Sequence, residues 1–296
     1  MSIPVGTLAL LAFALLAIGY LVFLILGSIQ KFSPIIKDVW PILHVETLII
    51  AVIAGALWIG GWVLTAVLIA HAFRVAWEAA NVATKRATLT PPLIYAANTV
   101  FISVIAVLFA PLWLVAVICL AVTGGCFFLR GLTQNERGKV ALDLTMFPGA
   151  PLILFTSAGI TGGYEAWLLL AFMMVEVFDS YALLGGKLFG RRKAFPILSP
   201  KKTVEGLGVG LAMLIVTAFL IAQIFGQSPA SAVLLAVSAA VLAVIGDLAA
   251  SRLKRLSGVK DYPQVLPHQG GLFDTTDAWI ATGSGMILIA LFTGSP

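Results

Sequence analysis

The sequence has few charged residues for its length. Of its 296 residues, 18 are Lys or Arg and 13 are Asp or Glu, so 10% of the chain is charged, whereas soluble domains carry about 25%. Hydrophobic residues make up 60% of the chain, and the mean hydropathy is +1.07. A soluble domain does not need so much apolar surface. The composition therefore excludes a soluble domain and indicates a protein that lies in a lipid bilayer.

Cysteine and histidine are also scarce. Cys119 and Cys126 are seven residues apart in one apolar run, which separates them by about 10 Å along a helix, too far for a disulfide. The three histidines, His44, His71 and His268, form no sequence cluster with the cysteines. There is no Gly-rich phosphate loop of the Walker type. These absences exclude a disulfide scaffold, a zinc centre and a P-loop nucleotide site.

Long apolar runs fill most of the chain. About 20 helical residues span the roughly 30 Å of hydrocarbon in a bilayer, so these runs predict an all-α polytopic membrane protein with about nine transmembrane helices. The first run has no basic segment before it and no clear small-residue cleavage site, so we interpret it as a retained helix rather than a signal peptide. The predicted spans are residues 5–27, 47–71, 92–109, 111–129, 146–160, 164–184, 206–225, 230–250 and 276–293.

Basic residues fall on one side of this predicted topology. With the N-terminus in the cytoplasm and the C-terminus outside, sixteen Lys and Arg lie in cytoplasmic loops and only Lys31 and Lys37 lie outside. This bias accounts for the net charge of +5, so no nucleic-acid partner is expected. We expect an integral protein of a bacterial inner membrane whose active site faces the cytoplasm. It would form one membrane domain, with N-terminal helices in residues 1–145 and the catalytic region in residues 146–296. The basic segment 74–90 predicts either an amphipathic helix on the inner leaflet or a plain connecting helix.

Polar residues of the types used in catalysis and phosphate binding lie in the second half of the chain. Glu176 and Asp179 are three residues apart inside or at the end of a predicted span, where a carboxylate is costly unless it faces a partner or a wet cavity. The next loop ends in Lys201, Lys202 and Thr203 at the start of a span. Amines beside a helix N-terminus suit an anion such as phosphate. A structural ion pair, or contact with anionic lipid, is the alternative for each group.

A second polar stretch lies between the last two spans. Asp247, Ser251 and Lys254 share one stripe of a helix, and Asp274 and Asp277 are three residues apart just before the last span. Mg²⁺ prefers carboxylate and phosphate oxygens, and nearby lysines would bind the same phosphates. The pattern therefore indicates Mg²⁺-dependent phosphoryl or nucleotidyl transfer at a membrane surface.

Four sequence blocks resemble the phosphatidate cytidylyltransferase family, also called CDP-diacylglycerol synthase. In chain order they are FDSYALLGGKLFGRRK, SPKKTVEG, SRLKRLSGVKD and GGLFDTTD, and the resemblance covers about residues 170–290. It implies that a lipid phosphate, with phosphatidate as the expected substrate, attacks the α-phosphorus of CTP to form a CDP-lipid and pyrophosphate. Mg²⁺ is the implied cofactor. A second metal, a monovalent ion and a homodimer stay open.

The resemblance also implies roles for individual residues. Asp247, Asp274 and Asp277 would hold the metal, and together with Lys254 they form the expected catalytic group. Basic side chains would neutralise phosphates, and paired glycines would let the backbone approach them. The expected substrate-binding residues are Asp179, Ser199, Lys201, Lys202, Thr203, Ser251, Arg255, Lys260, Asp261, His268, Gly270 and Gly271.

The chain departs from the family pattern in two places. The histidine of the Gly-His-Gly-Gly block is displaced by one position, to His268, and Thr275 stands where relatives carry Arg, with Thr276 at the next, apolar position. Arg252 or Lys260 is expected to supply the missing charge. The departures leave open a related membrane enzyme that uses CTP on an isoprenoid alcohol or isoprenoid phosphate. A transporter or a non-catalytic scaffold is a further alternative. It is disfavoured because ionisable groups cluster at the ends of late spans.

Overall fold

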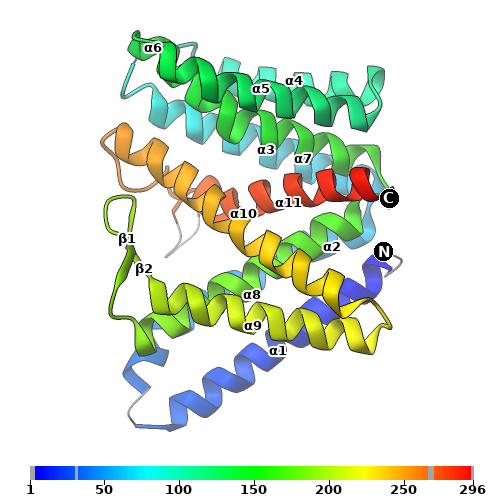
Figure 1. The fold of residues 1–296 in the computed structure, drawn as a ribbon, viewed down its shortest axis with the longest axis vertical. Helices are drawn as coiled ribbons and strands as arrows, with labels where there is room; N and C mark the ends of the chain where they lie inside the picture. The colour runs from blue at the N-terminus through cyan, green and yellow to red at the C-terminus, as the bar shows by residue number, and fades with distance from the viewer. Residues whose placement is uncertain (1–3, 31–32, 88, 266–269, 295–296) are drawn as a thin grey trace.

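The computed structural model describes residues 4–30, 33–87, 89–265 and 270–294. Within them the protein is a bundle of helices with one two-stranded hairpin (Figure 1). The first half contains α1 (Val5–Ser28), α2 (Ser33–Ile59), α3 (Gly61–Ala83), α4 (Pro92–Phe109), α5 (Leu112–Leu132), α6 (Glu136–Leu144), the kinked turn η1 (Thr145–Gly149) and α7 (Ala150–Thr161). The second half contains α8 (Glu165–Phe189), β1 (Lys193–Phe195), β2 (Ser199–Thr203), α9 (Val204–Ile224), α10 (Pro229–Leu256) and α11 (Leu272–Thr293).

Nine helical stretches of the described chain are long and apolar enough to cross a bilayer. One of them, Glu136–Thr161, combines α6, η1 and α7 and is kinked at Phe147, whose backbone is extended (φ −156°, ψ 124°). A shorter apolar helix, Leu43–Ile59, forms the second part of α2. The predicted all-helical membrane fold is thereby confirmed. The predicted division between residues 145 and 146 falls inside the kinked stretch.

The prediction of a single span over residues 47–71 is wrong. The chain turns sharply at Gly60 and Gly61, whose φ angles are 67° and 53°. Glycine adopts this region without the steric penalty that a Cβ brings. As a result α2 ends at Ile59 and α3 begins at Gly61. Both sides of the turn are apolar, so the hydropathy pattern continues straight through it.

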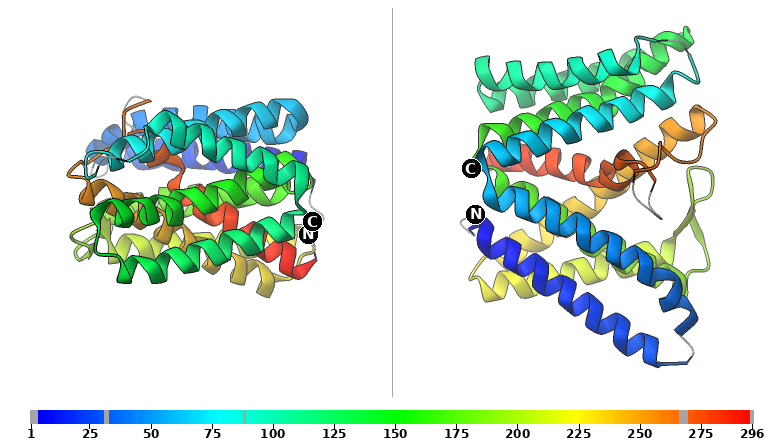
Figure 2. Two further views of the ribbon diagram at one scale, coloured as in Figure 1. Left: turned by 90° about the horizontal axis from the view of Figure 1, so that it is seen from above. Right: turned by 180° about the vertical axis from the view of Figure 1, so that it is seen from behind.

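The start of α1 and the end of α11 lie at the same end of the bundle (Figures 1 and 2). The predicted topology placed them on opposite sides of the membrane, and the structure does not agree with that arrangement. The turn between α2 and α3 explains the difference, because it adds one helix to the path of the chain. The hairpin, α6 and the C-terminal end of α10 lie together at the other end (Figure 1). We call it the hairpin end.

The second half of helix α3 is packed inside the bundle. It continues to Ala83 without a surface segment, and Val75, Ala76, Glu78 and Ala79 are buried. The prediction that residues 74–90 form an amphipathic helix on the leaflet or a plain connection is therefore wrong for the part within α3. Glu78, the acidic residue of this helix, is covered by protein rather than by water.

Glycines allow close contacts among the last four helices. Gly210 of α9 lies against the carbonyl of Phe178 in α8, and Gly246 of α10 lies against the carbonyl of Asp277 in α11. A Cβ at either glycine would come within 2.6 Å of that oxygen. Small residues at helix crossings in membranes permit this approach. The contact at Gly246 brings its neighbour Asp247 next to Asp277.

Candidate active site

Lys202 stands at the centre of a group of acidic residues at the hairpin end. Its Nζ lies 3.3 Å from Asp247 Oδ2 on α10 and 3.6 Å from Asp179 Oδ1 on α8. The carboxylate of Asp277 on α11 also acts electrostatically on Lys202. We call these four residues the Lys202 cluster. It joins three helices and a strand that are separate in the sequence.

The hairpin holds Lys202 in this position. β1 and β2 pair antiparallel, with Lys193 opposite Thr203. Thr203 Oγ1 accepts a hydrogen bond from Gly206 N (3.1 Å) and so caps α9. In the first turn of α9, Glu205 accepts bonds from the backbone N–H groups of Arg191 (3.0 Å) and Arg192 (3.1 Å). The hairpin is therefore anchored at both ends to one helix terminus.

The Lys202 cluster contains more acidic groups than basic ones. Three carboxylates and one ammonium leave a net charge of −2 when all four groups are ionised. Burial by itself lowers the pKa of Lys202, but Asp179, Asp247 and Asp277 outweigh it and raise that pKa above its ordinary value. The ammonium is therefore charged at neutral pH. Among the described residues, Asp247 Oδ2 is a buried oxygen that no hydrogen bond satisfies, with only the ion pair to Lys202 beside it.

Asp274 belongs to a different, balanced arrangement. One of its oxygens contacts the ammonium of Lys254. The other accepts hydrogen bonds from Tyr262 N and Gly271 N, both 2.9 Å long. Burial, with the carboxylates of Asp277 and Asp274 nearby, raises the pKa of Tyr262 well above its ordinary value. Asp274 thus ties the loop before α11 to α10.

The structure does not assemble the predicted metal site from three aspartates. In the described parts of the chain there is no group of three or more His, Cys, Asp or Glu placed to hold one metal ion. Asp274 is engaged by Lys254 and two backbone N–H groups. Asp247 and Asp277 remain as neighbouring carboxyl groups that interact electrostatically. They fit Mg²⁺ in the manner usual for this ion, through one or two carboxylates together with substrate phosphates.

Several predicted substrate-binding residues organise the loop before α11. Arg255 donates to the carbonyl of Val259 (3.2 Å). A Cβ on Gly270 would collide with the carboxylate of Asp274, and one on Gly271 would collide with that of Glu78. The two glycines are therefore needed so that backbone can pass close to these carboxylates.

The other predicted residues differ in their exposure. Ser251 is buried on the same stripe of α10 as Asp247, and Ser199 is half-buried where β2 pairs with β1. The exposed side chains are those of Lys201, Lys260 and Asp261. His268 lies outside the described residues.

Three side chains of α3, which the sequence did not predict as site residues, support the start of α11. Glu78 is fully buried and accepts hydrogen bonds from Leu272 N (3.1 Å) and Phe273 N (2.9 Å). Arg74 pairs with Glu78 and donates to the carbonyl of Pro263 (3.3 Å). The available signal was a carboxylate in the segment 74–90, which was predicted to lie outside the membrane spans, and it gave no indication of partners almost 200 positions away.

His71 and Thr276 form the third contact between α3 and α11. His71 Nε2 and Thr276 Oγ1 are 2.9 Å apart, and both side chains are buried. Thr276 occupies the position where the family pattern has an apolar residue, and the structure gives it a polar partner. This departure from the pattern is therefore accommodated by α3.

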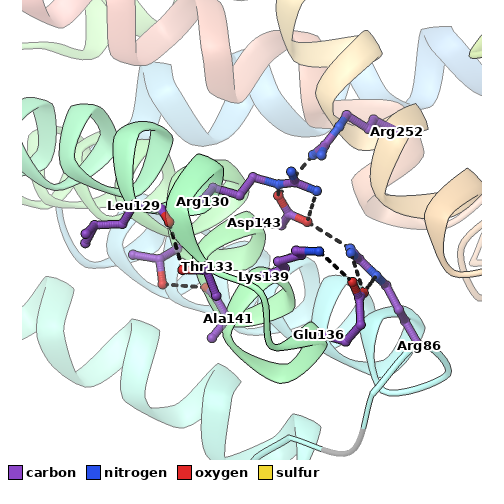
Figure 3. A network of polar contacts seen from close by, with 10 residues as sticks. Arg86, Leu129, Arg130, Thr133, Glu136, Lys139, Ala141, Asp143 and Arg252 are labelled. Carbon is purple, nitrogen blue, oxygen red and sulfur yellow. Dashed lines mark hydrogen bonds and ion pairs between the residues drawn. The ribbon is translucent and has the colours of Figure 1, made fainter.

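Arg252 does not take the place of the arginine missing at position 275. Its Nη1 donates to Asp143 Oδ1 (3.0 Å), as Figure 3 shows. Arg252 and Lys254 are two residues apart and project about 200° apart around α10. The expectation that Arg252 compensates is thus contradicted by its contacts. The other proposed residue, Lys260, is exposed.

Sequence comparisons find proteins named phosphatidate cytidylyltransferase that are similar to part of this chain. This chain is 39% identical over 136 residues to phosphatidate cytidylyltransferase 5, chloroplastic, of Arabidopsis thaliana, covering 45% of this chain and 34% of that protein. It is 37% identical over 120 residues to a phosphatidate cytidylyltransferase of Haemophilus influenzae, covering 38% of this chain and 42% of that protein. The matched region thus spans less than half the length of these curated relatives.

A sequence profile of the cytidylyltransferase family covers much more of the chain. It matches residues 42–293. This range runs from α2 to the end of α11 and includes both the Lys202 cluster and the supporting residues of α3. The chain belongs to the cytidylyltransferase family.

Proposed function

We propose that this protein is a CTP-dependent cytidylyltransferase that converts phosphatidate to CDP-diacylglycerol and releases pyrophosphate. Its family and the names of its relatives support this function. The observation that carries the proposal is the position of Lys202 between Asp179 and Asp247 at the hairpin end. A charged amine among carboxylates at the end of membrane spans suits a nucleotide and a lipid phosphate that meet there.

The reaction exchanges one bond to phosphorus for another. A phosphate oxygen of the lipid bonds to the α-phosphorus of CTP while the bond from that phosphorus to the pyrophosphate oxygen breaks. A phosphate monoester is already largely ionised at neutral pH, so no strong general base is required. Lys202 and Lys254 neutralise phosphate oxygens and hold the reactants in line. Positioning and charge neutralisation of this kind supply most of the acceleration in such transfers.

Asp247 and Asp277 are the residues that would hold Mg²⁺. When bound, the ion supplies charge neutralisation on the transferring phosphate. Asp274 keeps its contacts with Lys254 and the loop in this scheme, and it acts as a positioning residue. In this proposal Asp274 is not a metal ligand, and it holds Lys254 and the loop before α11 in place.

An apolar cavity beside α8 suits the acyl chains of the lipid. It is lined by residues of α1 such as Leu15 and by Ser180 and Tyr181 of α8, which directly follow Asp179 in the chain. The reactive phosphate at the Lys202 cluster and the chains along α8 would then belong to one substrate. We infer that the lipid enters from the bilayer along this helix.

We further infer that the hairpin end faces the cytoplasm, where CTP is available. The basic residues Arg191, Arg192 and Lys193 on the hairpin agree with the positive-inside tendency. Both ends of the chain would then face the opposite side. Single cysteines at Ile197 and Gly294, in a chain with Cys119 and Cys126 replaced by Ala, test this by labelling of intact vesicles. Position 197 should react only from the cytoplasmic side and position 294 only from the other. Reaction of both from one side would contradict the orientation.

The activity itself is tested with purified protein, labelled CTP, Mg²⁺ and a panel of lipid phosphates, with product mass as the measurement. Phosphatidate should yield CDP-diacylglycerol. Lys202→Met should lower kcat/KM about 100-fold or more, the effect of removing one preorganised charge-stabilising group. The matched control Lys193→Met removes an exposed amine from the paired strand β1 and should change kcat/KM by no more than about threefold.

Other outcomes of this assay would replace the proposal. Turnover of a polyprenyl phosphate or an isoprenoid alcohol, without turnover of phosphatidate, would indicate the isoprenoid enzyme that Thr275 and the displaced His268 leave open. No turnover of any lipid by folded protein would favour a non-catalytic role.

A further inference from the structure

A second charged cluster lies on another face of α10 (Figure 3). Its centre is Asp143 of α6, whose side chain is 3% exposed. Three arginines surround it, and they come from separate elements: Arg86 from the turn after α3, Arg130 from the last turn of α5, and Arg252 from α10. We call these four residues the Asp143 cluster. Its contacts connect the first half of the chain to the helix that bears Asp247.

The Asp143 cluster has more donors than its acidic partners can accept. The three guanidinium groups carry about fifteen N–H donors, and a carboxylate offers about four lone-pair sites. Asp143 accepts four hydrogen bonds from these arginines. Glu136, which is 54% exposed, pairs with Arg86 and with Lys139. Four cations and two carboxylates leave the region with a net charge of +2.

An apolar groove of about 730 Å³ begins at this cluster. Asp143, Arg130 and Arg252 line its polar part. The remaining lining is apolar and includes Phe127 and Phe128, which are 75% and 68% exposed. Both phenylalanines lie on α5, a predicted membrane span, so their exposed faces meet lipid rather than water. The groove therefore joins a cationic end to walls that suit hydrocarbon.

We propose that this groove binds one anionic phospholipid as a ligand distinct from the substrate. Its phosphate would lie against Arg130 and Arg252, and an acyl chain would follow the phenylalanines of α5. Guanidinium groups bind phosphate through paired, charge-assisted hydrogen bonds. Basic pockets between membrane helices are suited to anionic head groups. The excess positive charge favours a lipid of net negative charge over a zwitterionic one with the same phosphate.

The position of the groove separates it from the site of reaction. Arg252 and Lys254 project to different faces of α10, and Lys254 contacts Asp274 while Arg252 contacts Asp143. A lipid in the groove would thus contact α5, η1 and α10 without meeting the Lys202 cluster. It would brace the junction between the two halves of the chain.

Binding is measured by native mass spectrometry of the full-length protein with phosphatidylglycerol or phosphatidylcholine added and CTP omitted. The wild type should retain phosphatidylglycerol at least tenfold more than phosphatidylcholine. Ala249→Phe places a ring in the groove without removing an arginine, and it should abolish this preference. Val241→Phe adds the same ring at an exposed position of α10 outside the groove, and it should leave retention as in the wild type.

A second variant separates binding from folding. Arg252→Gln keeps a polar side chain at a position that is 34% exposed, and it should lower retention of phosphatidylglycerol about tenfold, the loss of one charge-assisted contact. Equal retention of the two lipids by the wild type, or undiminished retention by Ala249→Phe, would overturn the proposal. Because no turnover is measured, these outcomes are independent of the proposed cytidylyltransferase activity.

Discussion

The Lys202 cluster and the Asp143 cluster are built from opposite charge ratios. The first places one ammonium among three carboxylates, and the second places one carboxylate among three guanidinium groups. Both use α10, and both lie at the hairpin end of the bundle. The protein thus maintains an acidic centre and a basic centre on two faces of one helix.

Two other ion pairs nearby show what balanced charge does in this fold. Lys254 pairs with Asp274, and Arg74 pairs with Glu78. Each pair is one-to-one, and each carboxylate also accepts backbone N–H groups at the start of α11. Balanced pairs therefore hold the loop and the helix in place. The unbalanced clusters retain charge that a ligand of opposite sign can neutralise.

The largest expected effect is the loss of turnover when an aspartate of the Lys202 cluster is replaced. Asp247→Asn and Asp277→Asn should each reduce turnover by about 10³-fold or more, since these groups act on the transferring phosphate and its metal. The free energy of unfolding should be unchanged or higher, because removing one of three neighbouring carboxylates relieves repulsion. Turnover and thermal unfolding in detergent measure the two effects. Glu136→Gln, at an exposed position outside the Lys202 cluster, is the control. Near wild-type rates for both variants at saturating Mg²⁺ would contradict the assignment.

The Asp143 cluster should show the opposite result, a large loss of stability with a small loss of turnover. Asp143→Asn removes the buried carboxylate that three arginines share, which leaves Arg130 and Arg252 without their acidic partner. Because these arginines are only partly buried, the free energy of unfolding should fall by about 3 kcal/mol, the lower end of the cost of breaking a buried pair. Turnover per folded molecule should fall much less than in Asp277→Asn. Equilibrium unfolding in mixed micelles, paired with activity normalised to folded protein, measures this. Glu136→Gln, with its exposed side chain, should leave the free energy of unfolding close to that of the wild type. Equal stability of Asp143→Asn and wild type would remove the contrast.

Glu78→Gln should have an intermediate effect on catalysis. The carboxamide has one acceptor oxygen where the carboxylate uses two, for Leu272 N and Phe273 N. If the start of α11 is held less firmly, Asp277 on that helix is less well positioned. The value of kcat should then fall about tenfold, while KM for CTP changes little. Steady-state kinetics separates the two constants. Glu165→Gln, in the first turn of α8, provides a matched control. A rise in KM with unchanged kcat would argue against a positioning role.

The smallest effect is expected for Thr275→Arg, which restores the residue of the family pattern. Thr275 is half-buried in the first turn of α11, and its Oγ1 donates to the carbonyl of Gly271 (3.2 Å). We expect the variant to be tolerated, with kcat within about threefold of the wild type and KM for phosphatidate equal or lower, since arginine binds phosphate bidentately. A tenfold rise in KM would show that the site has adapted to the threonine.

Local patterns predicted the residues of the acidic centre more successfully than their arrangement. Asp247 and Lys254 were predicted on one stripe of a helix, and α10 confirms that helix. The prediction that Asp274 joins Asp247 and Asp277 rested on spacing near one helix end. Spacing does not show which neighbour a carboxylate will contact, and here Lys254 and the backbone of the loop engage Asp274.

The sequence alone established a bundle of membrane helices, and it predicted that the reactive groups lie in the second half of the chain. Both properties follow from composition and short-range spacing, which depend on neighbours within a few turns. The tertiary structure was needed to show that Gly60 and Gly61 divide one apolar run into two helices, that Glu78 holds the start of α11, and that Asp143 gathers arginines from three elements. These features depend on backbone torsion and on partners more than 100 residues away, such as Arg252 for Asp143, and the local pattern of hydrophobicity and charge contains neither.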